Sequence, residues 1–105
     1  MKFTVLDWDQ KPHEFEWEAV ECYSQDARRV ITTGLLWMEG GILATGVAVK
    51  HPSDSRCFEG ERLAFTRALK SATGKLTRRK VYYVDVREAW KRATSKAWQE
   101  ANGKA

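Results

Sequence analysis

The stretch RVITTGLLWMEGGILATGVAVK, residues 29–50, decides the fold of this chain of 105 residues. Two runs of β-branched and other apolar residues flank Gly40 and Gly41, and paired glycines adopt the positive φ angles that a two-residue hairpin turn requires. A turn centred on these glycines would pair Trp37 with Ala44. Because this is the most hydrophobic part of the chain, we expect its two strands near the centre of a sheet.

Small residues line one face of the second strand of this hairpin. Ala44, Gly46 and Ala48 alternate with larger side chains, and alternate residues of a strand point to the same face of a sheet. The pattern predicts a smooth strip on which a helix packs closely.

Two more strands precede the hairpin. Residues 3–8 and 14–23 alternate between apolar and polar side chains, as half-buried strands do. In the second of them, Phe15 and Trp17 would face the core. The outward row would then be acidic and consist of Glu14, Glu16 and Glu18.

A helix is expected after the hairpin. Ser53, Asp54 and Ser55 are all good N-caps, and the helix would run to about Thr73 and stop at Gly74. Its apolar side would consist of Phe58, Phe65, Ala68, Leu69 and Ala72.

A fifth strand and a second helix would complete the fold. The sequence KVYYV, residues 80–84, predicts a short strand. The last helix would begin with a capping box, Asp85 as N-cap and Glu88 at N3, and run to about Asn102. The predicted order is ββββαβα. We therefore expect a single α+β domain over residues 1–105, with two helices on a largely antiparallel sheet of four to five strands.

Composition excludes several classes of protein. Hydrophobic residues make up 43% of the chain, which is too many for a disordered segment. The longest apolar stretch, residues 34–49, is too short and too interrupted to span a bilayer. Two cysteines, Cys22 and Cys57, are too few for a disulfide scaffold. We therefore expect reduced thiols in a cytoplasmic protein that does not bind membranes.

Few residues suit a metal site or an active site. The soft metal ligands are His13, Cys22, His51 and Cys57. No two of them lie at the short spacings of zinc sites. His51 and Cys57 could form a thiol–imidazole pair at the start of a helix, but free cysteine is more commonly a buried structural thiol. We expect no catalytic residue, no metal and no cofactor, and a protein that is not an enzyme.

Charge is distributed unevenly along the chain. Residues 1–26 hold seven acidic and two basic side chains, whereas residues 27–105 hold seven acidic and sixteen basic ones. A basic cluster neutralises phosphates or docks on an acidic protein surface, and a tryptophan beside it can stack on a base or fill a pocket. The residues expected to bind are Lys70, Lys75, Arg78, Arg79, Lys80, Arg87, Lys91 and Trp98.

The stretch GVAVKHPSDSRCFEGERLAFTRALK, residues 46–70, resembles a motif in small proteins of tailed bacteriophages. The residues that carry the resemblance are His51, Asp54, Phe58, Gly60, Leu63, Ala64, Arg67, Ala68 and Leu69. The resemblance implies a small accessory protein that is made during infection and binds host or phage machinery in the cytoplasm of the host cell. It implies no catalytic residue.

Together these patterns predict a non-enzymatic binding protein. The first expectation is a nucleic-acid binder that uses the basic loop at residues 75–80 and the last helix. The alternative is an inhibitor or adaptor that docks on an acidic host protein through a charged face. Either could be a homodimer.

Overall fold

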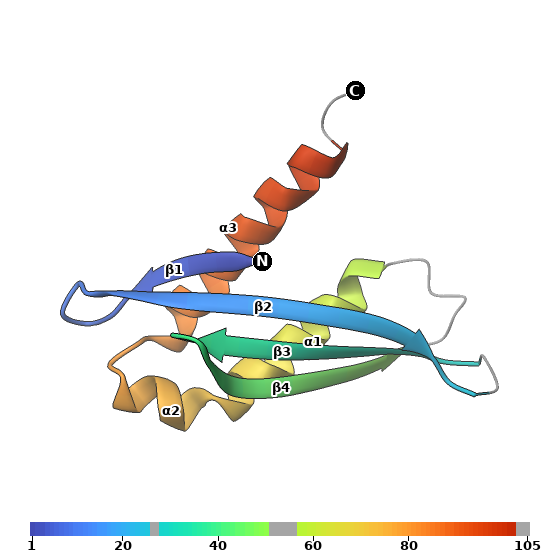
Figure 1. Ribbon diagram of the computed structural model, residues 1–105, viewed down its shortest axis with the longest axis horizontal. Coiled ribbons are helices and arrows are strands. Elements are labelled where there is room, and N and C mark those ends of the chain that lie inside the picture. The colour runs from blue at the N-terminus through green and yellow to red at the C-terminus, as the bar shows by residue number, and fades with distance from the viewer. Residues whose placement is uncertain (26–27, 51–56, 103–105) are drawn as a thin grey trace.

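Four strands form an antiparallel meander that is followed by three helices. The computed structural model describes residues 1–25, 28–50 and 57–102, and side chains within these ranges except at 57–59 and 97–102. The strand order is β1-β2-β3-β4, so each strand pairs with its neighbour in the chain (Figure 1). The elements are β1 (Lys2–Leu6), β2 (Pro12–Tyr23), β3 (Val30–Met38), β4 (Gly41–Lys50), α1 (Cys57–Ser71), α2 (Thr73–Arg78) and α3 (Tyr83–Asn102).

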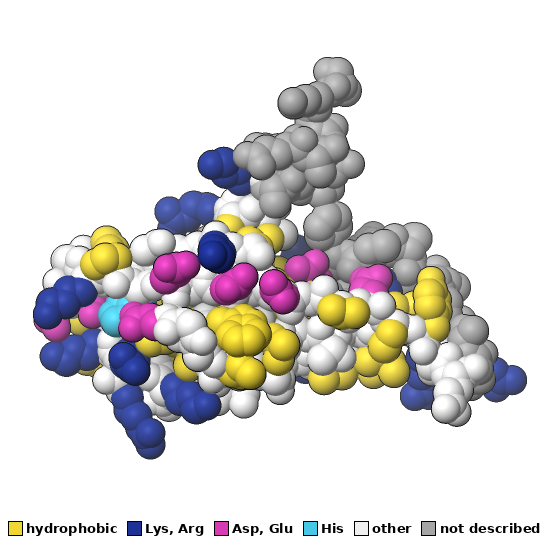
Figure 2. Space-filling view, viewed as in Figure 1, with side chains coloured by type: hydrophobic (Ala, Val, Ile, Leu, Met, Phe, Trp, Pro, Cys, Tyr) yellow, Lys and Arg dark blue, Asp and Glu magenta, His cyan; other side chains and the backbone are white. Residues whose placement is uncertain are grey.

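The helices cover only one face of the sheet. Helix α1 packs on β3 and β4, and α3 packs on β1; both lie behind the sheet in Figure 1. The shortest extent of the molecule is 21 Å, which fits one sheet and one layer of helices, since a helix is about 10 Å across. The predicted α+β class is confirmed, and none of the described helices covers the opposite face of the sheet, which Figure 2 shows.

The β3–β4 hairpin turns one residue earlier than predicted. Its central residues are Glu39 and Gly40, with φ of 53° and 82°, so Trp37 pairs with Ile42 and not with Ala44. Glu39 tolerates a left-handed backbone that glycine would adopt more readily because its carboxylate binds His13. The shift turns Trp37 to the open face of the sheet.

The smooth strip on β4 is confirmed. Ala48 is buried, and Ala44 packs against the core. A Cβ atom added to Gly46 would lie 1.9 Å from the carbonyl oxygen of Ala64 in α1. The helix backbone therefore rests directly on the strand backbone at Gly46, which only glycine allows.

The helical segment after the hairpin extends further along the chain than predicted, and it is divided into two helices, α1 and α2. Gly74 does not end it, because this glycine lies inside α2. The break falls at Ala72, where the Thr73 hydroxyl donates a hydrogen bond to the carbonyl of Lys70 at 2.9 Å, an interaction that bends helices. The predicted caps, Ser53, Asp54 and Ser55, and the side chain of Phe58 lie outside the described residues.

The predicted fifth strand at residues 80–84 is wrong. Lys80 has a φ of 58°, and its N–H donates to Thr77 while the N–H of Val81 donates to Leu76. These two bonds make a Schellman motif, in which Val81 and Leu76 also form the usual apolar contact; both are buried. The motif ends α2, so Lys80, and not the predicted Gly74, takes the left-handed position that ends the helical segment.

Helix α3 begins before the predicted capping box. Its first residue is Tyr83, so Asp85 is in the first turn and is not the N-cap. The Asp85 carboxylate still suits the positive end of the helix dipole there. The predicted end at Asn102 is confirmed. Among the described residues, no helix combines the length and the apolar character needed to cross a membrane.

Aromatic rings fill the core between the sheet and the helices. The Phe65 ring stacks on Trp90 with a centroid distance of 4.3 Å and meets Trp17 edge-on at 5.1 Å. Phe3 lies 6.5 Å from Phe65 and stacks on Phe15. As predicted, Phe15 and Trp17 are buried. Phe65 therefore joins α1 to α3 and to the sheet.

Two cations from the helix layer cover the outer edge of β4. Arg67 donates to the carbonyl of Val47 at 2.7 Å, and Lys75 donates to the carbonyl of Leu43 at 3.0 Å. An edge strand otherwise offers unpaired carbonyls to other strands. These charged side chains block the addition of a further strand at β4.

Candidate nucleic-acid interface

The structure divides the predicted binding residues into two groups. The first group, Lys75, Arg78, Arg79 and Lys80, lies at the end of the sheet where the turns meet. Arg79 lies 3.8 Å from the Glu39 carboxylate, and Lys80 lies 3.3 Å from that of Asp9. Since Lys75 is bound to β4, three of these four cations already have partners within the fold.

The second group lies on the helices. Arg87 and Lys91 are exposed on α3, and the Lys91 ammonium lies 3.8 Å from Glu88. Lys70 is exposed in the last turn of α1. The side chain of Trp98 lies outside the described residues, as do His51 and the side chain of Cys57.

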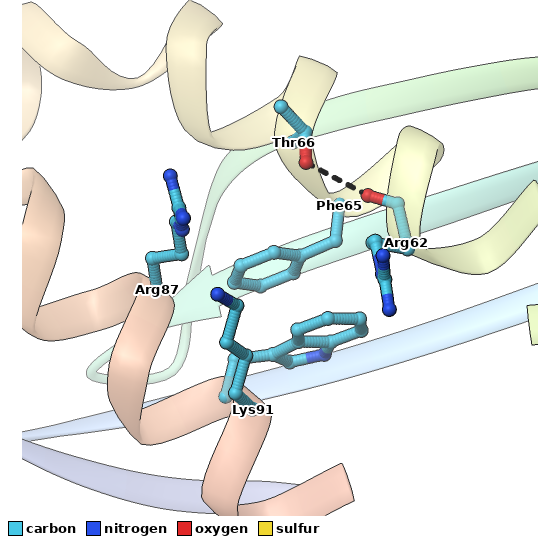
Figure 3. Close-up of a pocket in the computed structure, with 6 residues that line it drawn as sticks. Arg62, Phe65, Thr66, Arg87 and Lys91 are labelled. Carbon is cyan, nitrogen blue, oxygen red and sulfur yellow. Dashed lines mark hydrogen bonds between the residues drawn. The ribbon is translucent and has the colours of Figure 1, made fainter. Parts of the chain in front are cut away.

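A groove between α1 and α3 brings Arg87 and Lys91 together with a third cation, Arg62, which the sequence analysis missed. Figure 3 shows Arg62 on α1 and the other two on α3, arranged about the Phe65 ring. Neither Arg62 nor Arg87 forms an ion pair within the described part of the chain. The residues that line the groove are Arg62, Phe65, Thr66, Arg87, Trp90 and Lys91.

The spacing between arginine and aromatic residues on the two helices provides a sequence signal for this groove. Arg62-Leu-Ala-Phe65 and Arg87-Glu-Ala-Trp90 share the pattern Arg-x-Ala-aromatic. An arginine three residues before a buried aromatic ring lies on the same side of the helix as that ring. Because the two rings stack on each other across the helix interface, the two arginines come to flank one groove.

The groove has the chemistry of an anion site. Three of its six lining residues are cations, and none is a carboxylate. Its floor is the stacked pair of Phe65 and Trp90, which are both buried. The indole N–H of Trp90 is buried and has no hydrogen-bond partner among the described residues.

The volume of the groove limits the size of the ligand group that it can hold. The cavity measures about 130 Å³, well below the roughly 300 Å³ at which pockets for small-molecule ligands begin. The space suits one charged group of a larger partner, such as a phosphate of a nucleic-acid backbone, whose remainder would lie on the helix surface.

A second cluster of ionisable groups ties the two turns of the sheet together. His13 donates from Nε2 to the Asp7 carboxylate at 2.8 Å, and its Nδ1 contacts Glu39. Asp7 is buried and also accepts hydrogen bonds from the backbone N–H groups of Asp9 and Lys11. The imidazole thus bridges two carboxylates, which requires both ring nitrogens to donate.

The cluster shifts the pKa values of both partners. The hydrogen bond to Asp7 raises the pKa of His13 above its ordinary value of 6.5, and the contact with Glu39 adds to this effect. The hydrogen bond from His13, together with those from the backbone of Lys11 and Asp9, lowers the pKa of Asp7 below 3.8. Both shifts favour the charged pair.

We expect this cluster to make stability depend on pH. A His with a raised folded pKa contributes fully below about pH 6.5, and the contribution is lost as pH rises through the folded pKa. The contribution of Asp7 is present above pH 3.8 and is lost as pH falls through its folded pKa. Urea unfolding at a series of pH values should therefore show that the stability of the parent falls as the pH rises above about 6.5. A His13→Gln variant should lose this dependence, and an unchanged dependence would contradict the role of His13.

Within the described residues, no group of three His, Cys, Asp or Glu side chains is arranged to hold a metal ion. Cys22 is exposed and free. Comparison with models of protein families, with curated proteins and with solved structures finds no match to this chain.

Proposed function

We propose that this protein binds nucleic acid through the groove between α1 and α3. The observation that carries the proposal is the convergence of Arg62, Arg87 and Lys91 on one cavity without an acidic lining residue. Arginine presents a planar fork of donors that matches phosphate oxygens. Two arginines on opposite helices would hold one phosphate from two sides, and Lys91 would add a point charge.

The proposed site consists of the groove cations. Arg92 and Lys96 are also exposed on α3, but about 3.6 residues per turn places them around the helix from Arg87 and Lys91. Phosphate contacts supply most of the affinity of non-specific binding. The buried rings form the floor and position the cations, so the proposed recognition is electrostatic. The basic loop at residues 75–80 contributes less than the sequence suggested, because most of its charges are paired within the fold.

The test is the salt dependence of binding. A variant with Arg62→Gln, Arg87→Gln and Lys91→Gln should bind fluorescent oligonucleotides at least about tenfold more weakly at low salt. The slope of log affinity against log salt should fall by about one unit, because the three side chains hold one phosphate. Fluorescence anisotropy with single-stranded and duplex ligands, at several salt concentrations, measures both quantities.

A matched control removes three positive charges elsewhere. Lys2→Gln, Lys11→Gln and Arg29→Gln change exposed side chains outside the groove, so this variant should keep the affinity and most of the slope of the parent. If the two triple variants bind alike, net charge alone attracts the ligand and the groove is not a site.

The alternative proposal is an adaptor that docks on an acidic protein through the same cations. It predicts that an acidic polypeptide competes with the oligonucleotide and that a bacterial partner survives nuclease treatment in a pull-down experiment. Binding of an acidic polypeptide by a protein that binds no oligonucleotide would favour this alternative. In either case we propose a cytoplasmic accessory protein, since an exposed thiol such as Cys22 suits a reducing compartment.

A further inference from the structure

The face of the sheet that the helices leave open is apolar over β2, β3 and β4. Val20, Ile42, Val49 and Val47 are 67%, 58%, 48% and 44% exposed, and Leu35 and Trp37 between them are half-buried. We call these six residues the open-face patch. Figure 2 shows hydrophobic side chains gathered over these strands, beside a row of acidic ones.

The strand register brings the patch residues together on one face. Trp37 pairs with Ile42, and the uncharged Thr33 lies between Val20 and Val47. The patch residues carry no charge. The nearest charged side chains of the sheet are those of Glu16 and Glu18 on β2, which pair with Trp37 and Leu35. A polyanion finds no cation within the patch.

We propose that the open-face patch is the interface of a homodimer in which two sheets pack face to face. With a two-fold axis near β3, three strands of each copy overlap. Three strands spaced about 4.8 Å apart and about ten residues long cover about 14 Å by 33 Å, or about 460 Å² per copy. Two copies would bury about 900 Å², the size of a weak, reversible interface. A second copy offers the same uncharged surface, as a two-fold interface requires.

Charge selects the orientation of the two-fold axis. An axis perpendicular to the strands would place β2 over β2 of the partner and oppose the two acidic rows. An axis parallel to the strands and near β3 places β2 over β4 of the partner, where Arg67 and Lys75 reach the sheet edge through their bonds to the carbonyls of Val47 and Leu43.

The strand register brings these charges to the same level. Glu18 pairs with Leu35, and Leu35 pairs with Thr45 on β4. Thr45 lies between Leu43 and Val47, whose carbonyls accept the hydrogen bonds of Lys75 and Arg67. In the dimer, Glu18 of each copy would therefore lie opposite Arg67 and Lys75 of the other copy. The parallel axis is the arrangement in which opposite charges meet.

The proposed dimer is independent of the nucleic-acid groove. The groove lies on the helix side, so the dimer would leave a groove free on each of its two outer faces.

Sedimentation over a range of concentrations tests the dimer. The parent should sediment at twice the 12.1 kDa of one chain. Val47→Lys should raise the dissociation constant at least about tenfold, since it buries a charge in the interface. Thr33→Lys changes an exposed residue of the same face and should also raise the dissociation constant at least about tenfold. This second variant keeps the test valid if Val47→Lys does not fold. Leu63→Lys is the matched control, because Leu63 is 41% exposed on α1 and lies outside the patch.

A charge swap tests the axis. Glu18→Lys should weaken the dimer, and adding Arg67→Glu should restore it. A parent that stays monomeric at every concentration overturns the proposal, and so does equal dimerisation of the Val47 and Leu63 variants. A monomer whose patch instead captures phosphatidylcholine vesicles also overturns it. A tighter dimer in the Glu18→Lys variant overturns the parallel axis.

Discussion

Replacing Gly46 by alanine should destabilise the fold by about 3 kcal/mol or more, because the added methyl group meets main chain that cannot rotate away. A Cβ atom there would lie 1.9 Å from the Ala64 carbonyl oxygen and 2.9 Å from the Ala68 nitrogen. The clash would push α1 away from β4 and so disrupt the packing of the helix layer on the sheet. Chemical denaturation of parent and variant measures the loss.

Gly74 provides the matched control for this substitution. It lies within α2, and a Cβ atom there would meet nothing within 4 Å. Gly74→Ala should therefore stabilise the protein by about 0.5–1 kcal/mol, since alanine is the better helix former and restricts the unfolded chain. Equal stability of the two variants would mean that α1 does not rest on Gly46.

Phe65→Ala should lower the free energy of unfolding by about 3–5 kcal/mol, the usual cost of removing a buried aromatic ring. The ring is 1% exposed, and it contacts Trp90, Trp17 and Phe3. Its loss would leave a cavity where three parts of the fold meet. Tyr23→Ala serves as the control, because Tyr23 is 69% exposed and should change stability by at most about 0.5 kcal/mol. A loss below about 1 kcal/mol in the Phe65 variant would contradict its central place in the core.

The four strands could be predicted because each carries a periodic signal of its own. The alternation in β2 places Phe15 and Trp17 inward, and the small residues of β4 mark the seat of α1. The hairpin register was missed because Gly40-Gly41 and Glu39-Gly40 are both possible turn centres. The choice between them depends on a contact of the Glu39 side chain with His13, distant in the sequence.

The strand predicted at residues 80–84 failed for a similar reason. Valine and tyrosine favour strands, but the Schellman motif at Lys80 fixes the backbone through hydrogen bonds that a propensity does not encode. The candidate site was predicted in part. Arg87 and Lys91 followed from charge alone, whereas Arg62 required knowledge that the Phe65 and Trp90 rings stack across two helices.

The meander also bears on how the chain folds as it is made. Because every strand pairs with the strand that precedes it, β1 to β4 can assemble by successive hairpin closure, on a scale of about 1–10 μs each. A ribosome adds only about 5–20 residues per second, so each hairpin has time to form before the next strand emerges. Helix α1 follows the sheet directly in the chain and covers its apolar face early. The order of synthesis thus matches an order of assembly in which α3, which returns to β1, docks last.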